Sequence, residues 1–314
     1  MLGRSADGIY WMFRYLERAE NTARLLDAGF HLALTRGASI ASDEWRSVLV
    51  ALGQNGKFKA KGVDYTGSIV TNYILRGADN PDSVLAMIAQ ARANGRTVRT
   101  TITREVWEAV NESWMVLTAL LAQPVRERDL GPALATIRRQ AMLVRGAMEG
   151  TMLRNEIFNF ARIGTFIERA DNTARILDVK YYVLLPSASW VGTSLDNAQW
   201  ETVLRSLAGE RAYRWLYRGE MDAASIAEFL ILDGRFPRSL AFGLCKLESN
   251  MASLAREHGR ETPAHALMQD TAAKLRQTSI AAIIEYGLHE FITEFIAEVK
   301  KISQAIALDY RFSA

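Results

Sequence analysis

A thirteen-residue segment occurs twice in this chain of 314 residues, and no other feature restricts its fold as strongly. The first copy, YLERAENTARLLD, covers residues 15–27, and the second, FIERADNTARILD, covers residues 166–178. Nine of the thirteen positions are identical, and the other four exchange like for like. A solvated helix face tolerates many different charges, so polar identities kept in both copies indicate specific partners. These identities are Glu17, Arg18, Asn21, Arg24 and Asp27 in the first copy and Glu168, Arg169, Asn172, Arg175 and Asp178 in the second.

Both copies are predicted to be helical, because they are rich in Ala, Leu, Glu and Arg and contain neither Gly nor Pro. At about 100° per residue, Glu17, Asn21 and Arg24 fall on one polar arc beside an apolar stripe. Arg18 points about 100° away from Glu17 and therefore faces a different neighbour. The Glu-Arg pair of each copy is thus expected to contact two different partners.

Two interpretations of the polar arcs remain open. In the structural one, Glu17 pairs with Arg169 and Glu168 with Arg18 where the two helices cross. Buried ion pairs of this kind determine register more than they add stability. In the functional one, the arcs line a polar cleft that binds a ligand or a partner chain.

The rest of the chain predicts an all-α protein. All six prolines lie at breaks between helical patterns, and no stretch alternates with period two. The second half repeats the order of the first at an offset of 151 to 156 positions. This predicts a single domain, 1–314, built from two repeats, 1–150 and 151–314. We expect a duplicated helical bundle with internal pseudo-twofold symmetry and the two motif helices packed centrally.

Local signals predict several boundaries. The segment 53–67 is expected to be a loop. An Asp-Asn pair before Pro81 is expected to cap a helix that has this proline in its first turn. One continuous helix is expected over residues 279–308.

The composition is that of an ordinary globular protein, with 49% apolar residues, 23% charged residues and a net charge of +3. This charge requires neither nucleic acid nor a membrane surface, and no apolar run approaches the length of a membrane span. A single cysteine cannot form an internal disulfide and fits a reducing compartment, and no signal-peptide pattern is present. We therefore expect a cytoplasmic protein with no nucleic-acid or membrane partner.

Neither a cofactor nor a metal is expected. The segment 53–57, GQNGK, lacks the glycine spacing and the hydroxyl residue of a phosphate-binding loop. Di-iron helical bundles use Glu-x-x-His motifs, which are absent, and Arg24 would neutralise the acidic pair of its own copy. Cys245 lies in an apolar helical pattern and is expected to be a core thiol.

The paired motifs resemble the alpha-E family, which is named for a helical domain with a recurring Glu-Arg motif. The resemblance covers nearly the whole chain and extends to the segment 79–83, DNPDS. The corresponding segment of the second half, 235–239, has the sequence RFPRS, which keeps Pro and Ser but lacks the Asn. A role that needs this Asn in both halves is therefore not expected.

The resemblance implies a function in amide-bond chemistry. Alpha-E proteins are typically encoded beside, or fused to, circularly permuted ATP-grasp proteins that resemble amide-bond ligases, and transglutaminase-like peptidases often accompany them. The first hypothesis is a non-catalytic companion that binds the ATP-grasp protein or holds its peptide or amino-acid substrate. The alternatives are an enzyme acting on the ligase product, with Glu17 or Glu168 as general acid or base, and a purely structural assembly protein.

These hypotheses assign different roles to the motif. In a companion, its arginines hold carboxylates of the ligand or partner, its asparagines add hydrogen bonds, and its glutamates orient the arginines or bind an amine. Replacing Arg24 and Arg175 by Lys is then expected to weaken binding and leave the fold intact. In a structural protein, Glu17→Gln and Arg169→Met are expected mainly to lower the melting temperature.

Overall fold

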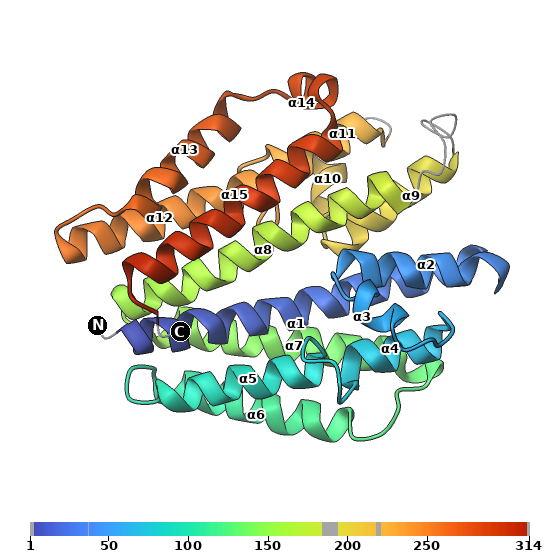
Figure 1. Cartoon of the computed structure of the whole chain (residues 1–314), viewed down its shortest axis with the longest axis horizontal. Helices are drawn as coiled ribbons and strands as arrows, with labels where there is room; N and C mark the ends of the chain where they lie inside the picture. The colour runs from blue at the N-terminus through green and yellow to red at the C-terminus, as the bar shows by residue number, and fades with distance from the viewer. Residues whose placement is uncertain (1–2, 37, 184–193, 218–220, 313–314) are drawn as a thin grey trace.

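A computed structural model describes residues 3–36, 38–183, 194–217 and 221–312, and all regular structure in these ranges is helical (Figure 1). The all-α prediction is confirmed for this part of the chain. In chain order the helices are α1 (Gly3–Arg36), α2 (Ala38–Ala51), α3 (Asn55–Lys59), α4 (Gly67–Arg76), α5 (Val84–Thr97), α6 (Arg104–Leu120), α7 (Glu127–Thr151), α8 (Glu156–Val183), α9 (Ser194–Ser206), α10 (Glu210–Leu216), α11 (Ala223–Ile231), α12 (Leu240–His258), α13 (Pro263–Gln277), α14 (Ile280–Tyr286) and α15 (Leu288–Asp309).

Helices α1 and α8 carry the two copies of the repeated segment, and they pack against each other in the middle of the molecule (Figure 1). Helices α2, α5 and α7 cover α1, while α12 and α15 cover α8. The apolar stripes of both motif helices are buried, including Ala23 and Leu26 on α1 and Ala174 and Leu177 on α8. The contact between the two helices places their polar arcs within reach of each other.

The contact between α1 and α8 depends on Gly164. A Cβ atom at this position would lie 2.3 Å from the carbonyl oxygen of Tyr10. Two non-bonded heavy atoms cannot approach that closely, and the neighbour is backbone that cannot rotate away. Glycine therefore permits the close packing of the two motif helices at this point.

The Gly164→Ala substitution is expected to destabilise the protein by about 2 kcal/mol. Forcing the helices apart costs roughly 3 kcal/mol, and the better helix propensity of alanine returns about 1 kcal/mol. The matched control is Gly146→Ala on α7, where a Cβ atom would meet nothing within 4 Å and stability should stay the same or rise. Urea unfolding of both variants measures the difference, and equal stabilities would contradict this account of the helix contact.

Helices α5 and α12, which cover the two motif helices, begin in the same way. Ser83 and Ser239 are their N-caps, and each side-chain oxygen accepts a hydrogen bond from the backbone N–H three residues later. Each serine follows a proline by two positions. As a result Asp82 and Arg238, which directly precede the caps, are held beside α1 and α8.

The helix that was expected to begin around Pro81 begins at Val84 instead. The reason is that Ser83, and not the preceding Asp-Asn pair, provides the cap. Asn80 is buried, and its Nδ2 donates to the carbonyl oxygen of Tyr73 at 3.1 Å. Its amide therefore links the end of α4 to the turn before α5 and does not cap the N-terminus of α5.

Four further expectations were wrong. Pro132, which was expected at a break between helices, lies inside α7. Pro186 lies outside the described residues. The predicted loop 53–67 contains the short helix α3. The predicted helix 279–308 is divided at Gly287, where φ is 116°, a conformation that favours glycine. Cys245 is exposed rather than buried, because its neighbour Leu244 takes the inward position on α12.

The buried apolar side chains of both halves form one continuous core. The division into two repeats of a single domain, 1–314, and their pseudo-twofold relation stay predictions. In the described ranges no helix is both long enough and apolar enough to traverse a membrane.

Candidate functional site

The Glu-Arg pairs of the two motif copies bind each other across the contact between α1 and α8. Arg169 donates from Nε and Nη2 to the carboxylate of Glu17 at 2.8 and 2.9 Å. Arg18 donates in the same manner to Glu168 at 2.5 and 2.9 Å. The reciprocal ion pairs of the structural interpretation are therefore present, and both are bidentate, which is a strong and geometrically specific arrangement.

Around Glu17 the chain forms an enclosed network, the first-copy cluster. Its members are Glu17, Glu20, Asn21, Arg24, Arg145, Arg169 and Arg238. Arg145 on α7 bridges the carboxylates of Glu17 and Glu20 at 2.6 Å each. Arg238 donates to the same two carboxylates and, at 2.7 Å, to Oδ1 of Asn21. Glu17 and Glu20 are only 2% and 0% exposed, so protein side chains enclose this copy of the motif.

Around Glu168 a corresponding set of side chains forms the second-copy cluster. Its members are Arg14, Arg18, Asp82, Glu168, Asp171, Asn172 and Arg175. Arg14 adds a second guanidinium to Glu168, with Nε at 2.9 Å. Arg175 donates to both carboxylate oxygens of Asp171, at 2.7 and 3.2 Å. Asp82 lies 3.9 Å from Nη1 of Arg18, at the edge of the cluster.

The two clusters differ in their access to solvent. The side chain of Arg24 is 11% exposed, whereas that of its counterpart Arg175 is 42% exposed. A cleft of about 350 Å³ opens beside the second-copy cluster. It is lined by Arg18, Thr22, Ala51, Leu52, Gly53, Gln54, Asp82, Glu168, Asp171, Asn172 and Arg175. The structural interpretation thus describes the first copy, and the second copy has the polar cleft of the functional interpretation.

The motif asparagines retain a hydrogen-bonding group that the protein does not use. Nδ2 of Asn172 is buried, and no hydrogen-bond partner for it occurs among the described residues; the same holds for Asn21. A buried donor without a partner costs about 1–3 kcal/mol. Because Asn172 lines the cleft, a ligand oxygen bound there can accept its hydrogen bond.

The motif glutamates are strongly acidic. Burial by itself would raise the pKa of Glu17, but the surrounding guanidinium groups outweigh burial and hold its pKa well below the usual range. For Glu168 the same opposition of burial and neighbouring arginines lowers the pKa to about 2. Both carboxylates are therefore anionic at neutral pH and are weak bases.

The motif aspartates lie outside the cleft. Arg138 on α7 donates to Asp27 at 2.8 Å, and Nδ1 of His289 on α15 lies 2.6 Å from Oδ1 of Asp178. Arg138 and His289 are 151 positions apart, the same spacing as the two motif copies. The repeat spacing could therefore have identified both residues from the sequence as partners of the motif aspartates.

Three arginines of the clusters had no such signal: Arg14, Arg145 and Arg238. The positions 151 residues after the first two hold threonine and isoleucine, so the repeat does not mark them. Arg238 lies in the segment 235–239, which was compared with 79–83 only for its proline and serine. Nothing in the sequence indicated a partner for its charge.

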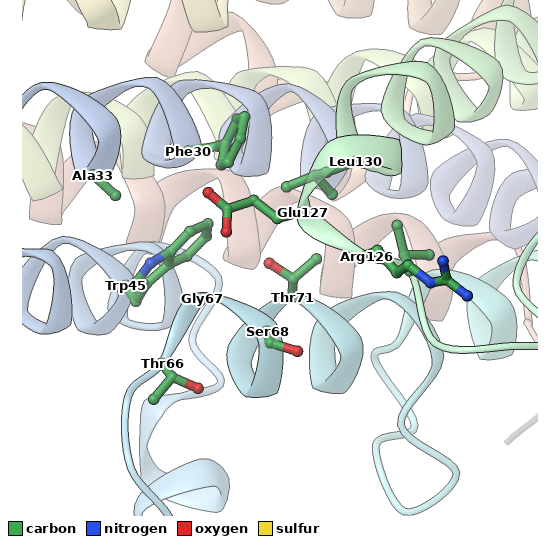
Figure 2. Close-up of a pocket in the computed structure, with 11 residues that line it drawn as sticks. Phe30, Ala33, Trp45, Thr66, Gly67, Ser68, Thr71, Arg126, Glu127 and Leu130 are labelled. Carbon is green, nitrogen blue, oxygen red and sulfur yellow. The ribbon is translucent and has the colours of Figure 1, made fainter. Parts of the chain in front are cut away.

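A second cleft, of about 430 Å³, lies between α1, α2, α4 and the start of α7. Figure 2 shows the carboxylate of Glu127 between the rings of Phe30 and Trp45. Volume alone would favour this cleft as a ligand site. It contains none of the repeated polar residues, however, so we place the candidate site at the second-copy cluster.

Within the described ranges, no three His, Cys, Asp or Glu side chains gather as metal ligands would. The carboxylates of both clusters face guanidinium groups instead.

Comparison with known proteins agrees with the paired motif. A family model described as a predicted alpha-helical domain with a conserved ER motif matches residues 1–310. The chain belongs to the Alpha-E family. This Alpha-E chain is 23% identical over 325 residues to the uncharacterised protein Mb2597 of Mycobacterium bovis and 22% identical to the uncharacterised protein Rv2567 of Mycobacterium tuberculosis. Each alignment covers 94% of the Alpha-E chain but 35% of the relative, so the chain spans about a third of those proteins. No solved structure matches it significantly.

Proposed function

We propose that this Alpha-E protein is a non-catalytic companion of an ATP-grasp amidoligase-type system for peptide or amide-bond synthesis or modification in the cytoplasm. In this proposal the cleft of the second-copy cluster holds a peptide or amino-acid ligand, and the circularly permuted ATP-grasp protein performs the nucleotide chemistry. A transglutaminase-like peptidase is a further proposed partner. The observation that carries the proposal is a polar cleft at one copy of a motif whose other copy is enclosed by protein.

We infer that duplication allowed the two copies to take different roles within one domain. The reciprocal pairs of Glu17 with Arg169 and Glu168 with Arg18 support a pseudo-twofold relation between the repeats. In this account the first-copy cluster maintains the packing of α1 on α8, and the second-copy cluster binds the ligand.

A binding role fits the glutamates better than acid–base catalysis does. An efficient general base at neutral pH has a pKa near 7. The pKa of Glu168 is about 2, and its two oxygens already accept four hydrogen bonds or ion-pair contacts from Arg14 and Arg18. Turnover of the ligase product by the isolated chain would contradict the companion proposal.

The proposed ligand contacts come from the second-copy cluster. Arg18 and Arg175 line the cleft, whereas Arg24 and Arg169 are directed into the first-copy cluster. We therefore propose that Arg175 contributes to ligand binding by positioning Asp171 in the cleft, and that Arg24 has a structural role. The Arg24→Lys substitution is then expected to affect stability, and Arg175→Lys to affect binding.

Gentle affinity purification of the tagged protein from its native host tests the proposal. The wild-type protein is expected to recover an ATP-grasp ligase-like protein in stoichiometric amount. Arg175→Ala is expected to reduce this recovery about tenfold, because it removes a side chain that lines the cleft and leaves Asp171 unpaired. Arg276→Ala on α13 is the matched control, since this arginine is also exposed and ion-paired, and full recovery is expected. If the folded wild-type protein is purified alone, the companion proposal is wrong.

A further inference from the structure

The two segments that precede α5 and α12 correspond in sequence and in geometry. Both have proline in the third position and serine in the fifth. In both, the serine N–H donates to the carbonyl oxygen three residues earlier at 3.0 Å, and the serine caps the following helix. Asp82 and Arg238 therefore occupy corresponding positions, each directly before a helix that covers a motif helix.

In the first-copy cluster, position 238 supplies a guanidinium. Arg238 donates to Glu20 at 2.6 Å, to Oδ1 of Asn21 at 2.7 Å and to Glu17 at 3.2 Å. The first copy of the motif is thus a guanidinium site, and a residue of the same chain occupies it. Its recognition groups are two carboxylates and one amide oxygen.

The second copy has the same recognition groups. The counterparts of Glu17, Glu20 and Asn21 are Glu168, Asp171 and Asn172, and all three line the cleft. The residue that corresponds to Arg238 is an aspartate, Asp82, which lines the same cleft and cannot supply a cation.

We propose that this cleft binds a ligand with a guanidinium or primary ammonium group, which contacts Glu168, Asp171 and Asn172 in the way that Arg238 contacts their counterparts. The inference rests on the proposed ligand-binding function and specifies its ligand as a basic amino acid, or a peptide with a basic residue. A cleft of about 350 Å³ suits a ligand of this size.

The charges in the two clusters are compatible with a bound cation. In the first-copy cluster four guanidinium groups face two carboxylates, a surplus of two positive charges that includes Arg238. In the second-copy cluster three guanidinium groups, together with the ammonium group of Lys57 at 3.3 Å from Asp82, face three carboxylates, so the surplus is one positive charge before a ligand binds. A bound cation gives the second-copy cluster the same surplus of two positive charges that the first-copy cluster already has.

An anionic ligand fits less well. The guanidinium groups of Arg18 and Arg175, which line the cleft, already donate to Glu168 and Asp171. An anion would have to displace these internal carboxylates and would also face Asp82. Like charges at such short range disfavour binding.

Titration calorimetry of the purified protein tests the proposal with three probes: agmatine, n-butylamine and glutarate. Agmatine and n-butylamine are expected to bind and glutarate is not. Asp82→Arg is expected to weaken agmatine binding at least about tenfold, because the new side chain places its own guanidinium where Arg238 lies in the other copy. The control Asp79→Arg makes the same charge change at an exposed neighbouring position outside the cleft, and agmatine affinity should stay within about twofold.

Three results would overturn the proposal: glutarate binding in place of the cations, no agmatine binding at about 10 mM, or equal weakening by the two variants. The melting temperature of Asp82→Arg is expected to be at or above that of the wild type. Such a value shows that the variant is folded and that weaker agmatine binding comes from the new side chain in the cleft. If agmatine does not bind but the ATP-grasp protein is still recovered in an Arg175-dependent way, the cation site is refuted and the companion role is not. Agmatine binding by a protein that recovers no ligase refutes the companion role alone.

Discussion

Replacing Glu17 by glutamine is expected to lower the free energy of unfolding by about 3–5 kcal/mol, the largest effect we predict for any single substitution. The carboxylate is 2% exposed and accepts from Arg145, Arg169 and Arg238. Glutamine preserves the shape but removes the negative charge, so Arg169 loses its carboxylate partner and Arg145 and Arg238 keep only the carboxylate of Glu20. Removing one partner of a buried ion pair is costly because the other partner stays desolvated.

Urea unfolding at pH 7 measures this loss, and the same substitution at a surface ion pair provides the control. Glu108 on α6 pairs with Arg104 four residues before it, and both side chains are more than half exposed. Such exposed pairs contribute little, so Glu108→Gln is expected to leave the unfolding midpoint unchanged. Similar midpoints for the two variants would show that the first-copy cluster does not stabilise the packing of α1 on α8.

The second large effect is a loss of stability in acid. Glu168 has a pKa of about 2 in the folded protein, against 4.5 as its ordinary value. Between these two values the unfolded chain binds the proton and the folded protein does not. The stabilisation is therefore complete above pH 5 and is lost as the pH falls toward 2. The difference in pKa corresponds to roughly 3 kcal/mol, and the lowered pKa of Glu17 acts in the same direction.

Unfolding free energies measured between pH 7 and pH 3 test this prediction. The wild-type protein should lose stability steeply below pH 5, whereas Glu168→Gln should show a shallower dependence. The difference between the two proteins should then become small at the lowest pH. Parallel curves would mean that the ion pairs of Glu168 with Arg14 and Arg18 do not lower its pKa in the folded state.

Much of the pairing at the centre of the molecule could be predicted from the repeat. The arcs on the two helices led to the pairs of Glu17 with Arg169 and Glu168 with Arg18, and both are present. A regular helix gives each residue a known direction, so two copies of one pattern restrict how the helices can face each other. The roles expected for Arg24 and Arg175 were assigned as equal, and the structure places only Arg175 at the cleft.

By itself the sequence determined that the chain is helical and that the motif helices share specific polar partners, because periodicity and repetition are properties of short segments. Only the tertiary structure decided which copy is enclosed and which has a cleft. That difference depends on Arg238, which reaches Glu17 from 221 positions away, and on Asp82 at the corresponding position before α5. Which long side chain reaches a buried carboxylate depends on how distant segments pack, and nothing in the local pattern of either segment specifies this.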